Sequence, residues 1–327
     1  MKETIRWGIV GPGKIAQSFA KDLAFVPEGR LVAVASRSME RATAFAQEYG
    51  ADKAYGSYEA LFKSKEVDVV YIATPHNSHE ALSIAAMEHG KHVLCEKPMG
   101  VTRTQVERMV ASSVKNGVFL MEALWSRFNP SIQKVKELVE NGKIGVIGHL
   151  RADFAFYALD RSEDGRLLNP NLAGGSLLDI GIYPAFLAYL MLGMPKKILS
   201  AANFYKTGVE MQTAMIFEYE TCQALLYSGL NATSEMRAEI AGSKGTAYLH
   251  PRWHEAPGYS LAMDDVVEDI LLPVTGKGYA HEIEEVHYCL RNGKIQSDLW
   301  SHQNSIDLIT ILDSVRNQNN IKFTFEK

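Results

Sequence analysis

The chain begins by alternating short apolar runs with amphipathic segments, and a glycine-containing turn joins the first two. Ile5 to Val10 is apolar and partly β-branched, and Ile15 to Ala24 has the pattern of a helix. Between them, Gly11 permits a tight turn, Gly13 leaves room for a phosphate, and Ala16 allows close packing of helix on strand. A glycine turn in this setting predicts dinucleotide binding, with a purely structural turn as the alternative.

The same alternation continues through the first third of the chain. The further predicted strands are Leu31–Ser36, Val67–Thr74, His92–Glu96 and Val118–Ala123. The predicted helices between them are Met39–Tyr49, Glu80–His89 and a segment from Thr102 to Asn116, and a capping box of Thr102 with Gln105 opens the last one. Repeated strand–helix units predict an α/β fold with a parallel, doubly wound Rossmann sheet.

After Trp125 the pattern changes to strands in succession. They are predicted at Val146–Phe156, Ile198–Tyr205, Met211–Tyr219, Gln223–Asn231, Ala238–Ala241 and Thr246–Leu249, with a last strand at Ile321–Phe325. Helices are expected from Pro130 and over Ser176–Leu192, Ala280–Leu290 and Ile306–Asn317. This order predicts a second, α+β domain with a mostly antiparallel sheet, so we divide the chain into residues 1–123 and 124–327.

Composition and charge narrow the class of protein. The chain is 46% hydrophobic and 22% charged, with a net charge of −4 and no long run of one sign, so we expect neither nucleic acid nor membrane as a partner. We expect no apolar stretch to reach the roughly 18 residues of a membrane span. The three cysteines are far apart and form no Cys-x-x-Cys pair, which fits a reducing cytoplasm.

Residues around the turn favour one cofactor over another. Lys14 and Ile15 open the helix whose free N–H groups attract phosphate. An NAD site places Asp or Glu about 20 residues further on, but this chain has Ser36, Arg37 and then Arg41. Because an arginine can hold a 2′-phosphate, the sequence predicts NADP, with NAD possible. The alternative is that both arginines form a solvated helix start.

The segment after the third strand, Thr74-Pro75-His76-Asn77-Ser78-His79, lies at the same predicted sheet edge. We expect Thr74, Pro75, His76 and His79 to line the nicotinamide ribose. Two histidines three residues apart also suggest a metal site. The sequence signals no third ligand, so no metal is predicted.

Lys97 follows the fourth strand, at the carboxyl edge where ligands bind in such sheets. Glu96 is expected near the nicotinamide ribose, and we hypothesise a cis peptide bond between Lys97 and Pro98. The alternative for Lys97 is an exposed lysine at a strand end.

The second domain contributes Asp179 and Tyr183, which are four residues apart and therefore share a helix face. A phenol becomes a useful proton carrier when a nearby ammonium lowers its pKa, and Lys97 would supply that charge. Tyr183 would then exchange a proton with a substrate oxygen, while Asp179 orients the substrate or the lysine. The alternative is a buried tyrosine and a helix-start aspartate without chemical roles.

Together these motifs resemble the Gfo/Idh/MocA oxidoreductases, in particular the subgroup of dimeric dihydrodiol and NADP-dependent D-xylose dehydrogenases. The resemblance rests on the glycine turn, Glu96-Lys97-Pro98, the segment Met121–Phe128 and the segment Gly174–Tyr183. It implies an open-faced second sheet that is often used for dimer contact, Lys97 and Tyr183 at the reacting oxygen, and Arg127 near the cofactor. Without it, Arg127 is predicted to be a surface charge.

The sequence therefore predicts a hydride-transferring NADP(H) oxidoreductase that acts on a secondary alcohol or carbonyl of a sugar or small diol. We expect a homodimer or higher homo-oligomer. Two alternatives stay open. One is a dehydrogenase of inositol or amino sugars in the same family, and the other is a non-catalytic NADP-binding sensor or partner protein.

Overall fold

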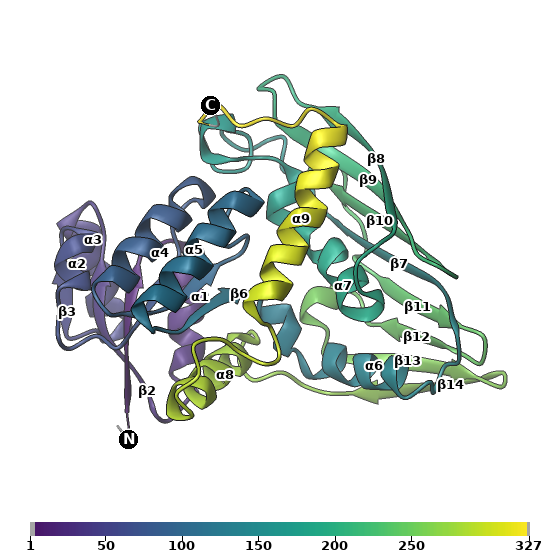
Figure 1. Ribbon diagram of the computed structural model, residues 1–327, viewed down its shortest axis with the longest axis horizontal. Coiled ribbons are helices and arrows are strands. Elements are labelled where there is room, and N and C mark those ends of the chain that lie inside the picture. Colours follow the sequence, from purple (N-terminus) through teal and green to yellow (C-terminus); the bar gives the residue numbers. More distant parts are fainter. Residues whose placement is uncertain (1–3, 326–327) are drawn as a thin grey trace. The chain divides into compact units, whose positions relative to one another are not determined.

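The computed structural model describes residues 4–325 and divides the chain into two compact units, drawn in Figure 1. The first unit consists of Met1–Phe128 and Thr275–Ile306, and the second of Asn129–Val274 and Asp307–Lys327. The sequence assigned all of residues 124–327 to one domain. In the structure, residues 275–306 return to the first unit.

The first unit is built on a six-stranded sheet in the order β3-β2-β1-β4-β5-β6, with every neighbouring pair parallel. This confirms the predicted Rossmann sheet. Its strands are β1 (Ile5–Val10), β2 (Gly29–Ala35), β3 (Lys53–Tyr55), β4 (Val69–Ile72), β5 (His92–Glu96) and β6 (Leu120–Ala123). Its helices are α1 (Lys14–Leu23), α2 (Met39–Tyr49), α3 (Tyr58–Phe62), α4 (His79–Glu88), α5 (Arg103–Asn116) and α8 (Tyr279–Arg291). The sequence did not predict β3 or α3.

Helix α8 belongs to the first unit because long-range contacts anchor its N-terminus. The buried carboxylate of Asp22, in α1, accepts hydrogen bonds from the backbone N–H groups of Lys277 and Tyr279 at 2.8–3.0 Å. At the other end, the Trp7 indole of β1 donates to Nε2 of His287 at 3.0 Å. An aspartate satisfies the free N–H groups of a helix start and favours its dipole. These contacts explain why 275–306 joins the first unit.

A group of buried acids lies where α8 packs against the sheet. The Tyr71 hydroxyl of β4 donates to the Glu96 carboxylate at the end of β5. Glu282, in the first turn of α8, is fully buried, and neither of its oxygens has a hydrogen-bond partner among the described residues. Burial, together with the nearby Glu96 and Asp22, raises the pKa of Glu282 well above its usual value. Glu282 is therefore neutral under conditions in which an exposed glutamate is ionised.

The second unit is built on an eight-stranded sheet in the order β14-β13-β12-β11-β7-β10-β9-β8. Only β7 and β10 are parallel, and the other neighbours are antiparallel, as predicted. The strands are β7 (Ile147–Ala155), β8 (Lys197–Phe204), β9 (Glu210–Glu218), β10 (Gln223–Gly229), β11 (Ala238–Gly242), β12 (Thr246–Leu249), β13 (Gly258–Met263) and β14 (Val266–Leu271). The sequence did not predict β13 and β14.

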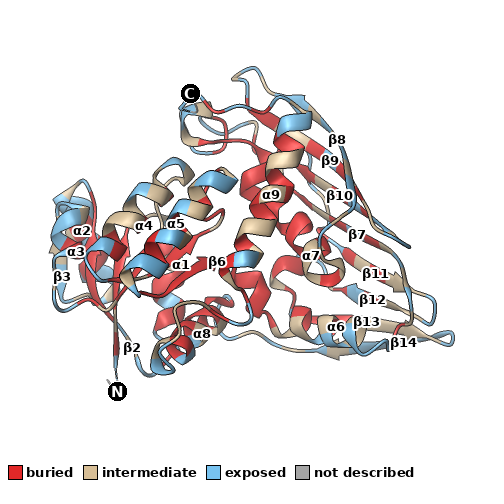
Figure 2. Ribbon diagram, viewed as in Figure 1, coloured by how far each residue is buried: buried red, intermediate tan, exposed pale blue. Residues whose placement is uncertain are grey.

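Helices cover one face of this second sheet. They are α6 (Pro130–Glu140), which lies against β12 and β13, and α7 (Ile182–Leu192), which lies against β7 and β10 (Figure 1). Burial is concentrated along the strands and the inward sides of the helices (Figure 2). On the other face, Leu199 and Leu225 are 42% and 44% exposed. The sheet is thus covered on one face and open on the other.

Segment Pro170–Leu192 is long and apolar enough to cross a membrane by length and composition, which differs from the sequence expectation. However, 83% of its most apolar window is buried inside the structure. Its apolar composition matches its position as the core helix of the second unit.

The end of the chain departs from the sequence prediction. Helix α9 spans His302–Gln318, but Ile321–Phe325 forms no strand in the described chain. Instead, Ile321 and Phe323 are buried, and the Arg316 guanidinium lies 4.3 Å from the centre of the Phe323 ring. The apolar alternation that suggested a strand reflects side chains packing beneath the helix.

Changing Glu282→Gln should make unfolding less sensitive to pH. Wild-type Glu282 keeps its proton in the folded state and loses it in the unfolded state, so the folded state is progressively disfavoured as pH rises above the unfolded pKa of about 4.3. The variant should match the wild type near about pH 4. Above that, it should gain stability relative to the wild type, with a slope of up to about 1.4 kcal/mol per pH unit.

Urea unfolding of both proteins from about pH 5 to about pH 8 measures this difference. Glu284→Gln is the matched control, because Glu284 lies on the same helix with its side chain 58% exposed. A Glu282→Gln difference that stays constant with pH would show that this carboxyl is ionised in the folded protein.

Candidate functional site

The glycine turn between β1 and α1 has the geometry of an anion cradle. Gly11 has a φ of +89°, and a Cβ there would lie 2.8 Å from the carbonyl oxygen of Ala73. A Cβ at Gly13 would meet nothing within 4 Å, and Gly13 caps α1 without a side-chain hydrogen bond. Lys14 and Ile15 are exposed at the helix start, while Ala16 is fully buried. Open space therefore lies before helix N–H groups that no side chain caps, which fits a pyrophosphate.

The end of β2 presents hydroxyl groups and cations. Ser36 is buried, and its Oγ accepts from the N–H of Ser38 at 3.2 Å. The Oγ of Ser38 in turn accepts from the N–H of Arg41 at 3.3 Å, which caps α2. Arg37 and Arg41 are exposed and form no ion pair with the residues the structure describes. Both guanidinium groups are available to an anionic ligand.

His79 joins the loops that follow β4 and β5. It is fully buried, and its two ring nitrogens lie 2.8 Å from the carbonyl oxygens of Thr74 and Pro98. Burial lowers the pKa of His79, the two carbonyls oppose this shift, and Lys97 adds to it. Since both nitrogens of His79 are occupied, the ring has no site left for a metal. Among residues 4–325, no three His, Cys, Asp or Glu side chains form a metal-binding group.

Ser78 and His76 lie in the same loop after β4 as His79 and make further contacts there. Ser78 does not cap α4 with its side chain, and its Oγ lies 2.9 Å from Oγ1 of Thr74 and 2.8 Å from the carbonyl oxygen of Pro75. The ring of His76, which is partly exposed, lies 5.7 Å from that of His79.

Lys97 is half-buried at the carboxyl end of β5, and its bond to Pro98 is cis, as hypothesised. The turn after it is held by Glu122 of β6, which accepts from the N–H of Met99 at 2.8 Å and from the Trp300 indole at 3.3 Å. Burial raises the pKa of Glu122, while these hydrogen bonds and the nearby Lys97 favour its charged form. The sequence did not single out Glu122 as a site residue, although a carboxylate inside an apolar strand indicates a special role.

Arg127 is only 6% exposed, so it is not the surface charge of the alternative interpretation. Its Nε donates to the carbonyl of Leu299 at 2.8 Å. Next to it, Trp125 stacks on Tyr279 with ring centres 4.7 Å apart. These contacts fasten the end of the Rossmann segment to the returning chain.

In the second unit, Asp179 lies in a π-helical turn, Leu177–Gly181, directly before α7. Such turns are rare and frequent at functional sites. Asp179 is 5% exposed, and its Oδ1 accepts from the Arg166 guanidinium at 2.6 Å. The side chain of Arg166 is 55% exposed. The sequence did not single out Arg166, because only folding of the loop after β7 brings it to Asp179.

Tyr183, in the first turn of α7, is 5% exposed and lies in an aromatic cluster. The ring centres of Phe154 and His254 lie 5.3 and 5.4 Å from that of Tyr183. Phe154 and His254 stack on each other with centres 4.2 Å apart. His254 is a further polar group beside the phenol that sequence reasoning missed, since it comes from the segment after β12.

The predicted site residues thus form two groups. The first unit gathers the glycine turn, the end of β2, the loop Thr74–His79 and Lys97 at the carboxyl ends of its parallel strands. The second unit holds Asp179 and Tyr183.

Comparisons with known proteins agree with this arrangement. Residues 5–124 match the model of an oxidoreductase family with an NAD-binding Rossmann fold, and residues 132–248 match the GFO/IDH/MocA C-terminal domain. The trans-1,2-dihydrobenzene-1,2-diol dehydrogenase of Mus musculus is 37% identical over 99% of both chains. The Homo sapiens enzyme of the same name is 34% identical over the same shares.

Among solved structures, the 3-ketoreductase KijD10 from Actinomadura kijaniata, in complex with NADP and TDP-benzene, has a TM-score of 0.88. It is 26% identical to this chain, and the match covers 96% of this chain and 97% of that one. Two family models that together span most of the chain, and relatives above 30% identity over nearly all of it, show the family. The chain belongs to the GFO/IDH/MocA oxidoreductases, enzymes with an NAD-binding Rossmann domain.

Proposed function

We propose that this oxidoreductase uses NADP(H) to interconvert a secondary alcohol and a carbonyl in a sugar or small diol. The observation that carries the cofactor choice is the end of β2, where Ser36 and Arg37 stand in place of a carboxylate. A carboxylate there would accept from a ribose 2′-hydroxyl and repel a 2′-phosphate. NADP is also the ligand of KijD10 in its crystal structure, and the diol dehydrogenases support the substrate class.

The chain's own residues supply binding, orientation and proton transfer. Bound NADP(H) would supply hydride transfer at its nicotinamide, and Gly11, Gly13 and the start of α1 would hold its pyrophosphate. Thr74, Pro75, His76 and Glu96 lie at the edge where its ribose is expected. We propose that Arg127 supports this pocket from within the core.

We propose that Lys97 and Tyr183 meet at the substrate oxygen. The ammonium of Lys97 would stabilise negative charge that develops on that oxygen, and the Tyr183 phenol would donate or accept its proton. Asp179, held by Arg166, would orient a neighbouring substrate hydroxyl. The aromatic cluster around Tyr183 keeps water from the phenol and presents apolar faces that suit a carbon ring.

Replacing Lys97→Met or Tyr183→Phe should lower turnover by about 10²–10⁴-fold, because each removes charge stabilisation or proton transfer in the transition state. The affinity for NADPH, measured by fluorescence titration, should stay within about threefold of the wild type, since neither group contacts the phosphates. Turnover is followed as NADPH oxidation across a panel of ketoses, diketones and diols.

Lys115→Met and Tyr288→Phe, at exposed positions, are the matched controls and should leave turnover unchanged. Tight NADPH binding without turnover on any carbonyl would support the sensor alternative. Turnover confined to inositols or amino sugars would support the other alternative in the family.

Replacing Arg37→Ala should reduce the preference for NADP over NAD by about 10–100-fold, because a charge-assisted hydrogen bond to the 2′-phosphate is lost. The ratio of kcat/KM values with the two cofactors measures this preference. Arg30→Ala is the control, since Arg30 lies at the opposite end of β2 and pairs with Asp52. An unchanged ratio in Arg37→Ala would assign the 2′-phosphate to another group.

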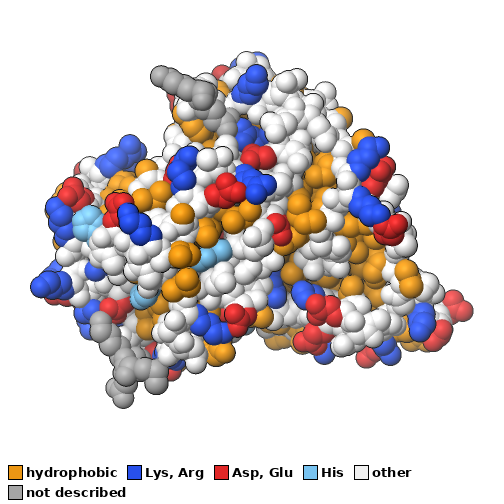
Figure 3. Space-filling model, in the orientation of Figure 1, with side chains coloured by type: hydrophobic (Ala, Val, Ile, Leu, Met, Phe, Trp, Pro, Cys, Tyr) orange, Lys and Arg blue, Asp and Glu red, His pale blue; other side chains and the backbone are white. Residues whose placement is uncertain are grey.

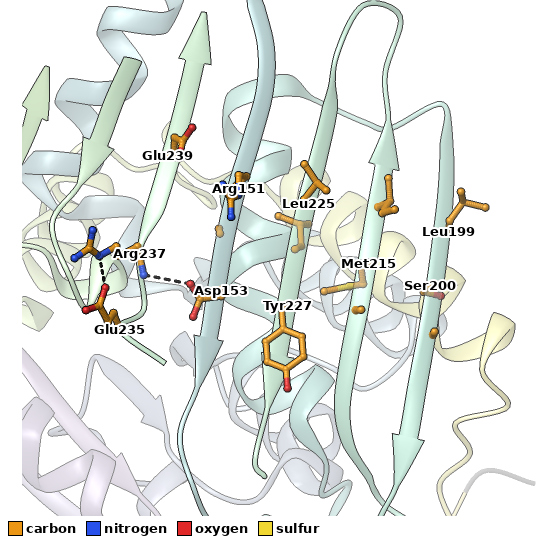
Figure 4. A pocket seen from close by; sticks show the side chains of 15 residues that line it. Arg151, Asp153, Leu199, Ser200, Met215, Leu225, Tyr227, Glu235, Arg237 and Glu239 are labelled. Carbon is orange, nitrogen blue, oxygen red and sulfur yellow. Dashed lines mark hydrogen bonds and ion pairs between the residues drawn. The ribbon is translucent and has the colours of Figure 1, made fainter. Parts of the chain in front are cut away.

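We propose further that a second copy of the chain covers the open face of the eight-stranded sheet. Apolar side chains of β8, β9 and β10 gather there, namely Leu199 and Leu225 (Figure 4) and Ile216, which pairs with both of them. Figure 3 shows hydrophobic side chains over the strands of this sheet, with charged groups of both signs at its margin. Arg151 and Glu239 place a positive and a negative charge on the same face. Two identical surfaces can pair when each carries charges of both signs, because opposite charges then meet across the interface.

Replacing Leu225→Glu should convert dimers to monomers, because it buries unpaired charge at the centre of an apolar contact. Light scattering of the purified protein measures the change. Val114→Glu, on exposed helix α5 of the first unit, should leave the assembly unchanged. A wild-type protein that is monomeric throughout would contradict this proposal.

A further inference from the structure

Glu210, the first residue of β9, is a buried carboxylate that lies against the catalytic segment of the second unit. It is 2% exposed. Its Oε1 accepts from the backbone N–H of Leu177 at 2.8 Å, at the start of the π-helical turn that contains Asp179. Its Oε2 has no hydrogen-bond partner among the described residues. One charge-assisted bond therefore fastens the turn that leads into Tyr183 to the sheet.

Gly175 makes room for this carboxylate, and Gly174 before it lies close to the preceding loop. Gly175 has a φ of +124°, and a Cβ there would clash with both carboxyl oxygens of Glu210. A Cβ at Gly174 would lie 2.7 Å from the carbonyl oxygen of Leu167, and Gly175 donates to that same carbonyl at 2.9 Å. A side chain at residue 175 would therefore displace Glu210, and a side chain at residue 174 would displace the loop before it.

The surroundings of Glu210 affect its ionisation in opposite directions. Burial raises the pKa of Glu210 to about 7, while the Leu177 N–H and the Arg316 cation of α9 favour the charged form. Arg316 also pairs with Asp313 at 2.9 Å. Two hydroxyl groups also lie beside the segment, those of Ser176 in the turn and Ser228 of β10, with their Oγ atoms 3.2 Å apart. Glu210 therefore changes charge within the ordinary working range of an enzyme.

We propose that Glu210 is a positioning residue: as a carboxylate it holds segment 175–183 in the geometry that presents Asp179 and Tyr183 to the substrate. This inference rests on the proposed function. A negative charge at the N-terminus of the turn and of α7 strengthens the bond to Leu177 and interacts favourably with the helix dipole. Protonation weakens both effects, so the segment loosens and turnover falls, although Glu210 is assigned no contact with the substrate.

The first test compares turnover of the wild type with that of Glu210→Gln, which keeps the shape and an acceptor for Leu177 but cannot ionise. The ratio of their kcat values should rise about tenfold from about pH 6 to about pH 8, following ionisation of one group near neutrality. In this ratio, any pH dependence of kcat that the two proteins share, such as one from proton transfer at Tyr183, cancels. The KM for NADPH should be the same in both.

Glu218→Gln is the matched control, because Glu218 ends the same strand and pairs at the surface with Lys197. Its ratio to the wild type should be flat with pH. A flat ratio for Glu210→Gln as well would overturn the proposal.

The second test does not depend on turnover. Hydrogen exchange of the peptide covering residues 174–181, followed by mass spectrometry, should be at least about tenfold faster in Glu210→Ala than in the wild type. Glu210→Gln should exchange faster than the wild type at about pH 8 and equally at about pH 6. Equal exchange in the wild type and Glu210→Ala would overturn the proposal. If the wild type turns over no substrate, the proposed function fails, and the exchange result still decides whether Glu210 holds the segment.

Discussion

The imidazole of His79 joins two loops that carry most of the first unit's candidate chemistry. Its nitrogens reach the carbonyls of Thr74 and Pro98, so the loop after β4 and the turn after β5 are fixed to each other. Glu122 holds the same turn from β6 through the N–H of Met99. Parallel strands end at a common edge, and these contacts turn that edge into a rigid frame for Lys97. A loosely held lysine could not stay close to one oxygen atom.

Buried carboxyl groups recur at the points where segments distant in sequence meet. Glu122 fastens the Lys97 turn, Glu282 lies beneath helix α8, and Glu210 fastens the π-helical turn before Tyr183. Burial raises the pKa of all three. Their surroundings differ, because Glu122 and Glu210 accept backbone N–H bonds, whereas Glu282 accepts none among the described residues. The first two hold the backbone through hydrogen bonds that they accept, whereas burial without a partner keeps Glu282 neutral.

The sequence alone predicted the elements whose patterns are local and strong. The bounds of β1, α2 and β5 match those expected, because an apolar run or a capped helix defines each of them. β3 has only three residues, and none of their side chains is buried, so its sequence shows no apolar run that would predict a strand. The predicted strand Ile321–Phe325 was wrong because alternation also arises when an extended chain packs beneath a helix.

The features that could not be predicted from the sequence depend on contacts between residues that are far apart in the chain. Asp22 binds the start of helix α8, more than 250 residues further along the chain, and no local sequence pattern predicts that hydrogen bond. In the candidate site, Lys97, Asp179 and Tyr183 belong to motifs that the sequence shows. Arg166, His254 and Glu210 were identified only from their contacts in the structure. Gly174 and Gly175 were noticed in the sequence, but only the structure shows that Gly175 leaves room for the Glu210 carboxylate and Gly174 for the carbonyl oxygens of the preceding loop.

We propose that an ammonium of the first unit and a phenol of the second act on one substrate oxygen. A double-mutant cycle in kcat with Lys97→Met and Tyr183→Phe tests it most directly. If both groups serve the same oxygen in the transition state, the double variant should lose far less than the product of the two single losses. Losses that multiply fully would show that the two groups act independently and would contradict the account.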